Sequence, residues 1–553
     1  MTSAEEMVAG YHERTKHHFH RYAASLGLDW ATQPDPFRRY AGADLVSLPL
    51  PKGERALPYW QLYTSAGVAP VPLSPASISL FFRYALSLTA WKKAGETTWP
   101  LRANPSSGNL HPTEGYAILP AIEDIGDAAG VYHYAPKEHA LERRTVLDAQ
   151  RWNELTESFP DGSFLVGLSS VHWREAWKYG ERAFRYCQHD VGHALACLRI
   201  SAATLGWKMA VLDGVSDETI ANLLGLDRDE DFAVAEREEA DLLILVSPDL
   251  PIPLLSASQP LTKHSEKLIW QGKANTLSRE HAVAWPIIDA VAQATRRLES
   301  APIEEDFSGF PSEEELFSTP IRQGLLSAET AILGRRSAVA MDGSTSISRD
   351  VFFGMLARLV PTQDREGMPW DAIPWRPRIH LGLFVHRVDG LAPGMYALAR
   401  DSDKVDAIKS AMSSEFCWQR VADCPPGLHL YLLEEGDCRE QAATVSCGQA
   451  IAGDGAFSLA MIADYQDSLA TYGSGFYRNL FWESGMVGQL LYLEAEEAGV
   501  RATGIGCYFD DPVHETFGIV SHDWQSFYHF TVGGPVDDNR ITTLPAYNSE
   551  EEQ

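Results

Sequence analysis

The sequence has little positive charge and no long apolar run, and each shortage excludes a class of partner. It contains 46 Lys and Arg residues against 75 Asp and Glu residues, for a formal net charge of -29. Binding to a phosphate backbone or to an anionic lipid surface needs clustered basic residues. The longest apolar runs, such as 242–246, are far too short to span a bilayer. We therefore expect neither a nucleic-acid partner nor a membrane partner.

Cysteine is also scarce and is not arranged for cross-linking. The seven cysteines are scattered, their number is odd, and no Cys-x-x-Cys pair occurs. This usage is typical of reduced thiols and predicts neither a disulfide framework nor a metal site. Residues 1–22 are polar and lack the apolar stretch of a secretory signal, so we expect a cytoplasmic protein.

Several common catalytic and nucleotide-binding motifs are missing. No Gly-x-Ser-x-Gly elbow and no Walker A loop are present, which argues against a serine hydrolase and a P-loop enzyme. The Gly-x-Gly-x-x-Gly fingerprint is missing too, so a redox cofactor would not be held in the Rossmann manner.

The sequence does contain an internal duplication, because two stretches match each other 293 positions apart without a gap. The paired positions are Tyr179 and Tyr472, Gly180 and Gly473, Arg185 and Arg478, Gly192 and Gly485, Gly206 and Gly499, Asp217 and Asp510, and Gly225 and Gly518. The copies differ in their polar loops. We therefore predict two copies of one scaffold with a composite site at the seam between them.

The length of 553 residues allows two to four domains. We predict an irregular, proline-rich lead segment over 1–76 that packs on the body, a first domain over 77–250, a connector over 251–329 and a second domain over 330–547. An acidic run in the connector, 304–306, is expected to be a solvated face.

Hydrophobic periodicity predicts the elements of both copies. In the first copy we expect helices over 77–93 and 182–205, and strands over 115–119, 130–134, 207–212 and 240–246. In the second copy we expect helices over 348–359 and 480–498, and strands over 379–385, 394–398 and 527–532. Each copy is then α+β, with strands packed against a long helix.

Three polar segments are candidates for binding. Residues 104–112 include Pro105, Ser106, Ser107 and Asn109, which could bind a heterocycle or a phosphate, or could cap a helix. Residues 334–337 offer two guanidinium groups and a hydroxyl, which could bind phosphate or form an exposed basic turn. Residues 504–506 would allow close backbone approach to a flat ligand, or form a plain turn. Arg540 is a further candidate phosphate ligand.

Lys178 and Tyr179 are candidates for moving protons. Lysine and tyrosine serve as base or acid when burial or a nearby charge shifts their pKa values. The second copy has Thr471 at the position of Lys178, so the scaffold does not require this lysine. A surface lysine is the alternative interpretation.

Taken together, these motifs resemble the nitroreductase superfamily of flavoproteins, and more closely its SagB-type dehydrogenase branch. The residues that carry the resemblance are Asn104 to Pro112, Lys178 to Arg182, Arg335 to Ser337, and Gly504 to Gly506. It covers roughly 77–250 and 330–545 and depends on the order and spacing of the motifs.

The resemblance implies FMN bound noncovalently at a dimer interface, which would here be internal to one chain. It places these FMN ligands in the second copy: Arg335, Arg336, Ser337, Gly504, Ile505, Gly506 and Arg540. It places these in the first copy: Pro105, Ser106, Ser107 and Asn109. The chain is thus expected to be a fused dimer with one FMN site. The mirror site lacks the motifs, with Ala210 to Asp213 in place of the Gly-Ile-Gly segment.

The resulting hypothesis is an FMN-dependent oxidoreductase that acts on a small molecule or a peptide, with Lys178 and Tyr179, which match a catalytic Lys-Tyr pair of that branch, handling the proton. One alternative is a NAD(P)H-dependent nitro- or quinone reductase. Another is a non-catalytic duplicate that binds partners in a biosynthetic complex. We expect a monomer acting as a pseudo-dimer, and whether two chains pair again stays open.

Overall fold

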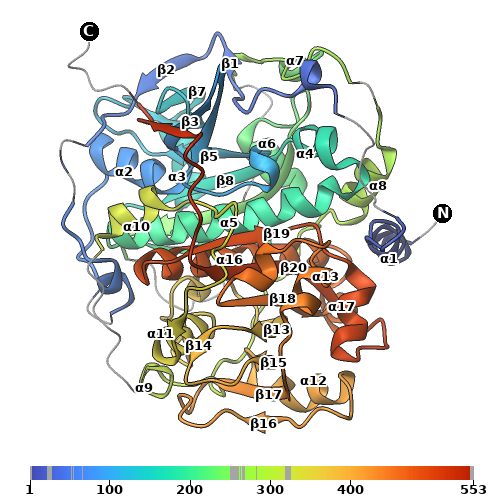
Figure 1. The fold of residues 1–553 in the computed structure, drawn as a ribbon. Coiled ribbons are helices and arrows are strands. Elements are labelled where there is room, and N and C mark those ends of the chain that lie inside the picture. Colours follow the sequence, from blue (N-terminus) through green and yellow to red (C-terminus); the bar gives the residue numbers. More distant parts are fainter. Residues whose placement is uncertain are drawn as a thin grey trace.

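A computed structural model shows two seven-stranded antiparallel sheets with the same strand order (Figure 1). It describes residues 3–21, 28–51, 53, 55–64, 67–249, 261, 263–264, 268–281, 283–317 and 326–547. The first sheet has the order β2-β7-β6-β5-β8-β10-β9, and the second β16-β17-β15-β13-β18-β20-β19. Matching strands occupy matching places, as a duplication predicts.

Seven strands of these two sheets were predicted, with bounds close to those observed, and the other seven were not predicted. The first sheet is built from β2 Asp44–Ser47, β5 Thr113–Leu119, β6 Ala129–Ala135, β7 Ala140–Leu147, β8 Phe164–Ser170, β9 Lys208–Val211 and β10 Glu239–Ser247. The second is built from β13 Ile379–Val385, β15 Gly394–Ala399, β16 Gln419–Arg420, β17 His429–Glu435, β18 Phe457–Asp464, β19 Arg501–Ile505 and β20 Trp524–Gly533.

Two long helices, α5 (Ala183–Thr204) and α16 (Phe476–Glu497), pack against each other between the sheets (Figure 1). Gly192 and Gly485 lie where the helices cross. A Cβ atom on Gly192 would overlap the backbone of Trp482, and one on Gly485 would overlap the backbone of His189. The matched glycines therefore permit the close approach of the two copies.

The 293-residue offset holds for three pairs of helices. These are α4 His172–Tyr179 with α15 Tyr465–Tyr472, α5 with α16, and α6 Asp217–Leu224 with α17 Asp510–Phe517. Two matched ion pairs cross the seam. Arg185 binds Asp510 at 2.8 Å, and Arg478 binds Asp217 at 2.7 Å. The predicted tandem α+β architecture is confirmed, and the retained arginines and aspartates join one copy to the other.

The helix predicted over 77–93 is wrong in its second half. Helix α2 spans Pro75–Ala85, and β3 then spans Leu88–Ala94. Strand β3 pairs with β4 (Thr97–Arg102) and with β21 (Thr542–Leu544), forming a third sheet. Apolar residues near this boundary fit either periodicity, and β3 pairs over six positions with the adjacent β4 and over three with the distant β21.

The lead segment is more ordered than predicted. Its first helix, α1 (Ala4–Arg14), begins with a capping box formed by Ser3 and Glu6. Tyr11, Tyr40 and Tyr59 are buried, and β2 belongs to the first sheet. The acidic run was also misjudged in part, because Glu305 binds Arg378 at 2.8 Å. Part of the predicted connector lies outside the described residues.

The remaining elements are short. The helices are α3 Ala149–Thr156, α7 Asp229–Phe232, α8 Pro286–Ala294, α9 Glu313–Leu316, α10 Ala328–Gly334, α11 Arg349–Ala357, α12 Val405–Ala411, α13 Arg439–Val445 and α14 Ile451–Asp454. The short strands are β1 Tyr40–Ala41, β11 Lys273–Ala274, β12 Ile347–Ser348 and β14 Val388–Asp389. Within the described ranges, no helix is long and apolar enough to cross a membrane.

Candidate active site at the seam between the copies

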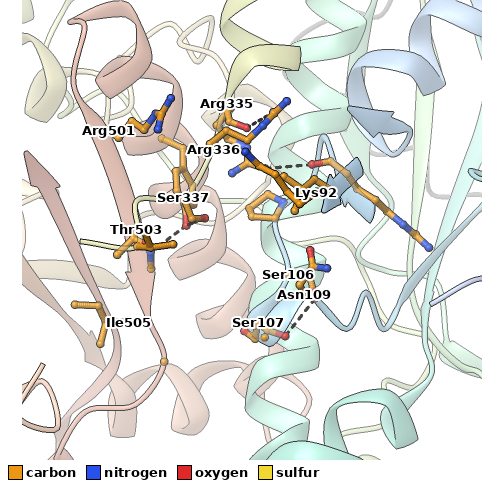
Figure 2. Close-up of a pocket in the computed structure, with 18 of the residues that line it drawn as sticks. Lys92, Ser106, Ser107, Asn109, Arg335, Arg336, Ser337, Arg501, Thr503 and Ile505 are labelled. Atoms are coloured by element: carbon orange, nitrogen blue, oxygen red, sulfur yellow. Dashed lines mark hydrogen bonds between the residues drawn. The ribbon is translucent and has the colours of Figure 1, made fainter. Parts of the chain in front are cut away.

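A cavity of about 810 Å³ lies at the seam and is lined by both copies (Figure 2). Its volume is within the range of sites for small molecules and cofactors. The predicted residues that line it are Pro105, Ser106, Ser107, Asn109, Tyr179, Arg335, Arg336, Ser337, Gly504, Ile505 and Gly506. The composite arrangement expected from the sequence is therefore present in the geometry.

Five cationic side chains line the cavity: Lys92, Arg102, Arg335, Arg336 and Arg501. Burial and the charge of Arg335 lower the pKa of Arg336 to about 10. Burial, together with Arg336 and Arg501, also lowers the pKa of Lys92. Holding like charges together is unfavourable unless an anion joins them, so this corner of the cavity is built for a negatively charged group.

The two adjacent arginines are held by oxygen atoms of the backbone rather than by carboxylates. Arg335 donates to the carbonyl oxygens of Arg102 and Ala103, at 3.1 and 3.3 Å, and so reaches the other copy. Arg336 donates to the carbonyl of Leu333 at 2.8 Å. Among the described residues, neither guanidinium forms an ion pair, so both keep their positive charge available to a ligand.

Arg540 does not line the cavity. Its side chain is 88% exposed and pairs with Asp538 at 2.7 Å. Arg501 lies at the cavity in its place. Arg501 begins β19, the strand that leads into the predicted Gly504–Gly506 segment, but nothing in the local sequence shows that its side chain lies at a cavity (Figure 2). Lys92 was missed because its segment was predicted to be helical.

Helix α5 holds the 104–112 loop, which follows β4, through side-chain hydrogen bonds. Ser107 donates to Asp190 through its backbone nitrogen, at 3.1 Å, and through its hydroxyl, at 3.3 Å. Ser106 Oγ accepts from the backbone nitrogen of His111 at 2.8 Å. Gly108 and Asn109 both have left-handed φ values, +62° and +60°. The loop therefore rests on the middle of α5 and does not cap that helix.

Lys178 and Tyr179 lie directly against Gly108. A Cβ atom there would be 2.5 Å from Tyr179 Oη and 2.8 Å from Lys178 Nζ, so only glycine fits. Tyr179 lines the cavity, whereas Lys178 lies beside it. Burial, reinforced by Glu175, raises the pKa of Tyr179 well above its usual range. Tyr179 therefore stays protonated and can donate a hydrogen bond into the cavity.

Several buried polar atoms near the 104–112 loop have no hydrogen-bond partner among the described residues. Asn104 Oδ1, His111 Nδ1 and Asp190 Oδ2 belong to residues that line the cavity, and none has a hydrogen-bond partner among the described residues. Burial raises the pKa of Asp190 to about 7. Unsatisfied buried polar atoms are rare in folded proteins, so this wall of the cavity fits a ligand with its own donors and acceptors.

Two tyrosine side chains pack against the backbone of Gly504 and Gly506 and leave no room for a larger residue at either position. A Cβ atom on Gly504 would overlap the hydroxyl of Tyr528, and one on Gly506 would overlap the ring of Tyr186. Tyr186 Oη also donates to the carbonyl of Gly506 at 3.0 Å. The glycines thus let aromatic side chains form the cavity wall, a reason for close approach that the sequence did not reveal.

Comparison with known proteins finds similarity to nitroreductases. The profile of the nitroreductase family matches residues 415–534. Trifolitoxin-processing protein TfxB of Rhizobium leguminosarum bv. trifolii is 31% identical over 170 residues, 29% of this chain and 45% of the relative. MJ1384 of Methanocaldococcus jannaschii, named as a nitroreductase, is 28% identical over 126 residues, 22% of this chain and 62% of the relative. Residues 415–534 of the chain thus match the nitroreductase family.

A solved structure shows that the fold of this chain has a precedent. A crystal structure from Anabaena variabilis, assigned as a nitroreductase, aligns with a TM-score of 0.70 over 96% of this chain and 99% of its own. The two share 23% sequence identity, so this likeness concerns the fold. The matches to the curated relatives span about half to three fifths of their length.

The pseudo-symmetric site is filled with side chains that bind one another. Its cavity measures about 250 Å³. Arg199, at the position of Tyr492, binds Asp371 at 2.7 Å. Glu483, at the position of Asp190, pairs with Arg400 and accepts from the backbone nitrogen of Arg378 at 3.0 Å. The charges of the mirror site are thus neutralised within the protein.

Proposed function

We propose that this chain is an FMN-dependent oxidoreductase of the SagB-type branch that acts on a small-molecule or peptide-derived substrate. One observation carries the proposal: both copies contribute cationic side chains to one corner of a single large cavity. FMN combines a dianionic phosphate with a flat polar ring. When bound, it would supply hydride transfer, while the protein supplies position and electrostatics.

The residues of the cavity divide into two groups that fit the two parts of FMN. The phosphate would be held by Arg335, Arg336, Arg501 and Lys92, which are four of the five cationic residues that line the cavity. The ring would lie between the 105–109 loop and the 504–506 segment. Guanidinium groups bind phosphate oxygens in pairs. The unpartnered atoms of Asn104 and His111 would bind polar atoms of the ring edge.

The protein's own contribution to chemistry would be control of one proton. Tyr179 keeps its proton because burial raises its pKa, so it acts as donor rather than base. Lys178 Nζ lies 5.3 Å from the centre of the Tyr179 ring and would stabilise negative charge that develops on the phenol oxygen. Gly108 fixes both side chains against the loop.

The similarity to TfxB favours processing of a toxin precursor, and hence a peptide-derived substrate. The similarity to MJ1384, named as a nitroreductase, instead favours a NAD(P)H-dependent nitro- or quinone reductase. The rates of reduction separate the two. A processing dehydrogenase should be reduced slowly by NAD(P)H and rapidly by its substrate, and a reductase should bleach rapidly with NAD(P)H.

The proposal is tested by the flavin content of the purified chain. We expect one FMN per chain, measured by absorbance of the flavin released on denaturation against a protein assay. Arg336→Gln should lose most of the bound FMN, whereas Arg540→Gln, a matched change at an exposed arginine, should keep it. Two flavins per chain would contradict the single site. A colourless protein that takes up no FMN would favour the non-catalytic alternative.

A further inference from the structure

A cluster of sulfur and nitrogen ligands lies at the cavity wall, directly after the Gly504–Gly506 segment. The ligand atoms of His17, Cys447 and Cys507 lie within 4.8 Å of one another. His17 is 3% exposed, and both cysteines are half-buried. Cys507 also lines the cavity, which gives an ion a route to the cluster. The three residues are far apart in the sequence, so only the fold brings them together.

The spacing of two of these atoms matches the geometry of a shared metal ion. Cys507 Sγ lies 3.5 Å from His17 Nδ1. In a tetrahedral zinc site, bonds of about 2.3 Å to sulfur and about 2.0 Å to nitrogen place two such ligands about 3.5 Å apart. Thiolate and imidazole are soft ligands and select zinc or copper(I) over magnesium or calcium.

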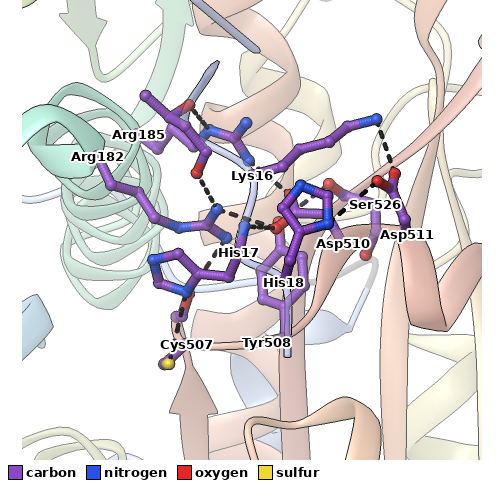
Figure 3. A network of polar contacts seen from close by, with 12 residues as sticks. Lys16, His17, His18, Arg182, Arg185, Cys507, Tyr508, Asp510, Asp511 and Ser526 are labelled. Atoms are coloured by element: carbon purple, nitrogen blue, oxygen red, sulfur yellow. Dashed lines mark hydrogen bonds and ion pairs between the residues drawn. The ribbon is translucent and has the colours of Figure 1, made fainter. Parts of the chain in front are cut away.

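Neighbouring residues hold the candidate ligands in place (Figure 3). The backbone nitrogen of His17 donates to Asp510 Oδ2 at 2.9 Å. Arg182 binds the same carboxylate at 3.0 Å, so the guanidinium charge nearest the cluster is already neutralised. The carbonyl of Cys507 accepts from Gln449 Nε2 at 2.9 Å. Such outer contacts orient the ligands of metal sites.

Two features show that the duplicated scaffold does not require the cluster. The position 293 residues before Cys507 is Gly214, which has no thiol. Cys447 has a left-handed φ of +57°, a conformation that favours glycine and costs a cysteine energy. The second copy therefore holds a thiol in an unfavourable backbone position, next to another thiol and an imidazole.

We propose that His17, Cys447 and Cys507 bind one soft metal ion, with zinc as the best match. The ion would tie the N-terminal segment to the wall of the seam cavity, and a water molecule or a substrate group would complete its coordination. Two thiolates balance the charge of a zinc ion. This site was not expected from the sequence, because its ligands do not form a local motif such as Cys-x-x-Cys.

The test uses the full chain without a histidine tag, purified in the presence of a non-chelating reductant. We expect about one zinc per chain after dialysis, measured by mass spectrometry of the metal. Co²⁺ added to the metal-free protein should give the visible bands of a tetrahedral thiolate site. Cys447→Ser and Cys507→Ser should each weaken zinc binding at least about tenfold. Cys417→Ser, a change at an exposed cysteine, should leave it unchanged.

Folding of the variants is checked by circular dichroism and by FMN content. Zinc should raise the melting temperature of the wild type and of Cys417→Ser, and should not raise that of Cys507→Ser. If a cysteine variant does not fold, His17→Gln gives the same comparison without the loss of a thiol. Equal zinc affinity in wild type and variants overturns the proposal. So does a wild type that binds neither zinc nor cobalt, including one in which Cys447 and Cys507 form a disulfide.

Discussion

The two pseudo-symmetric sites at the seam are surrounded by the same scaffold, but they differ in whether their buried charges are paired within the protein. In the large cavity, counting the described residues, Asp190 has one oxygen without a hydrogen-bond partner and the guanidinium of Arg336 pairs with no carboxylate. In the mirror site, Glu483 pairs with Arg400, and Arg199 pairs with Asp371. A buried charge needs a partner. The mirror site supplies the partner from the protein, whereas the large cavity leaves it to a ligand.

The two sites should differ most in the change of unfolding free energy when their matched acids, Glu483 and Asp190, are replaced by neutral amides. Glu483→Gln leaves Arg400 buried without a counterion and should cost about 3–5 kcal/mol of unfolding free energy. Asp190→Asn removes an unfavourable buried carboxyl and keeps an acceptor for Ser107, so at pH 8 it should be neutral or stabilising. Urea unfolding of both variants measures the difference. Equal costs would mean that the sites do not differ in this way.

The next difference should appear in turnover. Lys178→Ala should lower the rate constant of flavin reoxidation by a quinone by about 10²–10⁴-fold, because it removes the charge beside the proton donor Tyr179. FMN content should stay unchanged. Thr471→Ala, the same change at the matched position, should have no effect on rate. Loss of FMN from Lys178→Ala would instead make this lysine a binding residue.

The scaffold was largely predictable from the sequence because its signals are local and repeated. The offset between Gly192 and Gly485 located both long helices, and the structure explains it by their close crossing. The binding loops were also found, because their glycines and hydroxyls stand together. Lys92 and Arg501 could not be found in the same way, since an ordinary cation becomes a ligand only when the fold turns it toward a cavity.

The limits of prediction were set by long-range pairing. Strand β3 was predicted as helix because its apolar residues fit either periodicity, and its pairing with β4 and with the distant β21 is visible only in the fold. Arg540 was chosen from its place near the C-terminus, yet it pairs with Asp538 in solvent. Glu305 belongs to an acidic run that reads as solvated, yet it binds Arg378. In each case the local sequence pattern does not reveal the contact that determines where the residue lies.

The pH dependence of stability should also distinguish the sites. Burial raises the pKa of Asp190 to about 7 in the folded protein. Between the unfolded pKa of about 4 and this value, the folded state binds the extra proton, so stability should fall as pH rises. Asp190→Asn should remove this contribution. Urea unfolding at pH values between about 4.5 and about 8 gives the slope of the unfolding free energy against pH for each protein. Parallel slopes for wild type and variant would contradict the assignment.

The two sites should differ least in the contribution of one matched cation to FMN affinity. These cations are Lys208 and Arg501, the first residues of β9 and β19. Arg501 lines the large cavity but also binds Asp537 at 2.9 Å, so only part of its charge is available to a phosphate. Arg501→Gln should weaken FMN binding about tenfold, as expected for loss of one charge-assisted hydrogen bond. Lys208→Gln, at the mirror cavity, should leave the affinity unchanged. Fluorescence titration of the apoprotein with FMN measures both, and an equal loss in the two variants would show that the mirror cavity contributes to the same site.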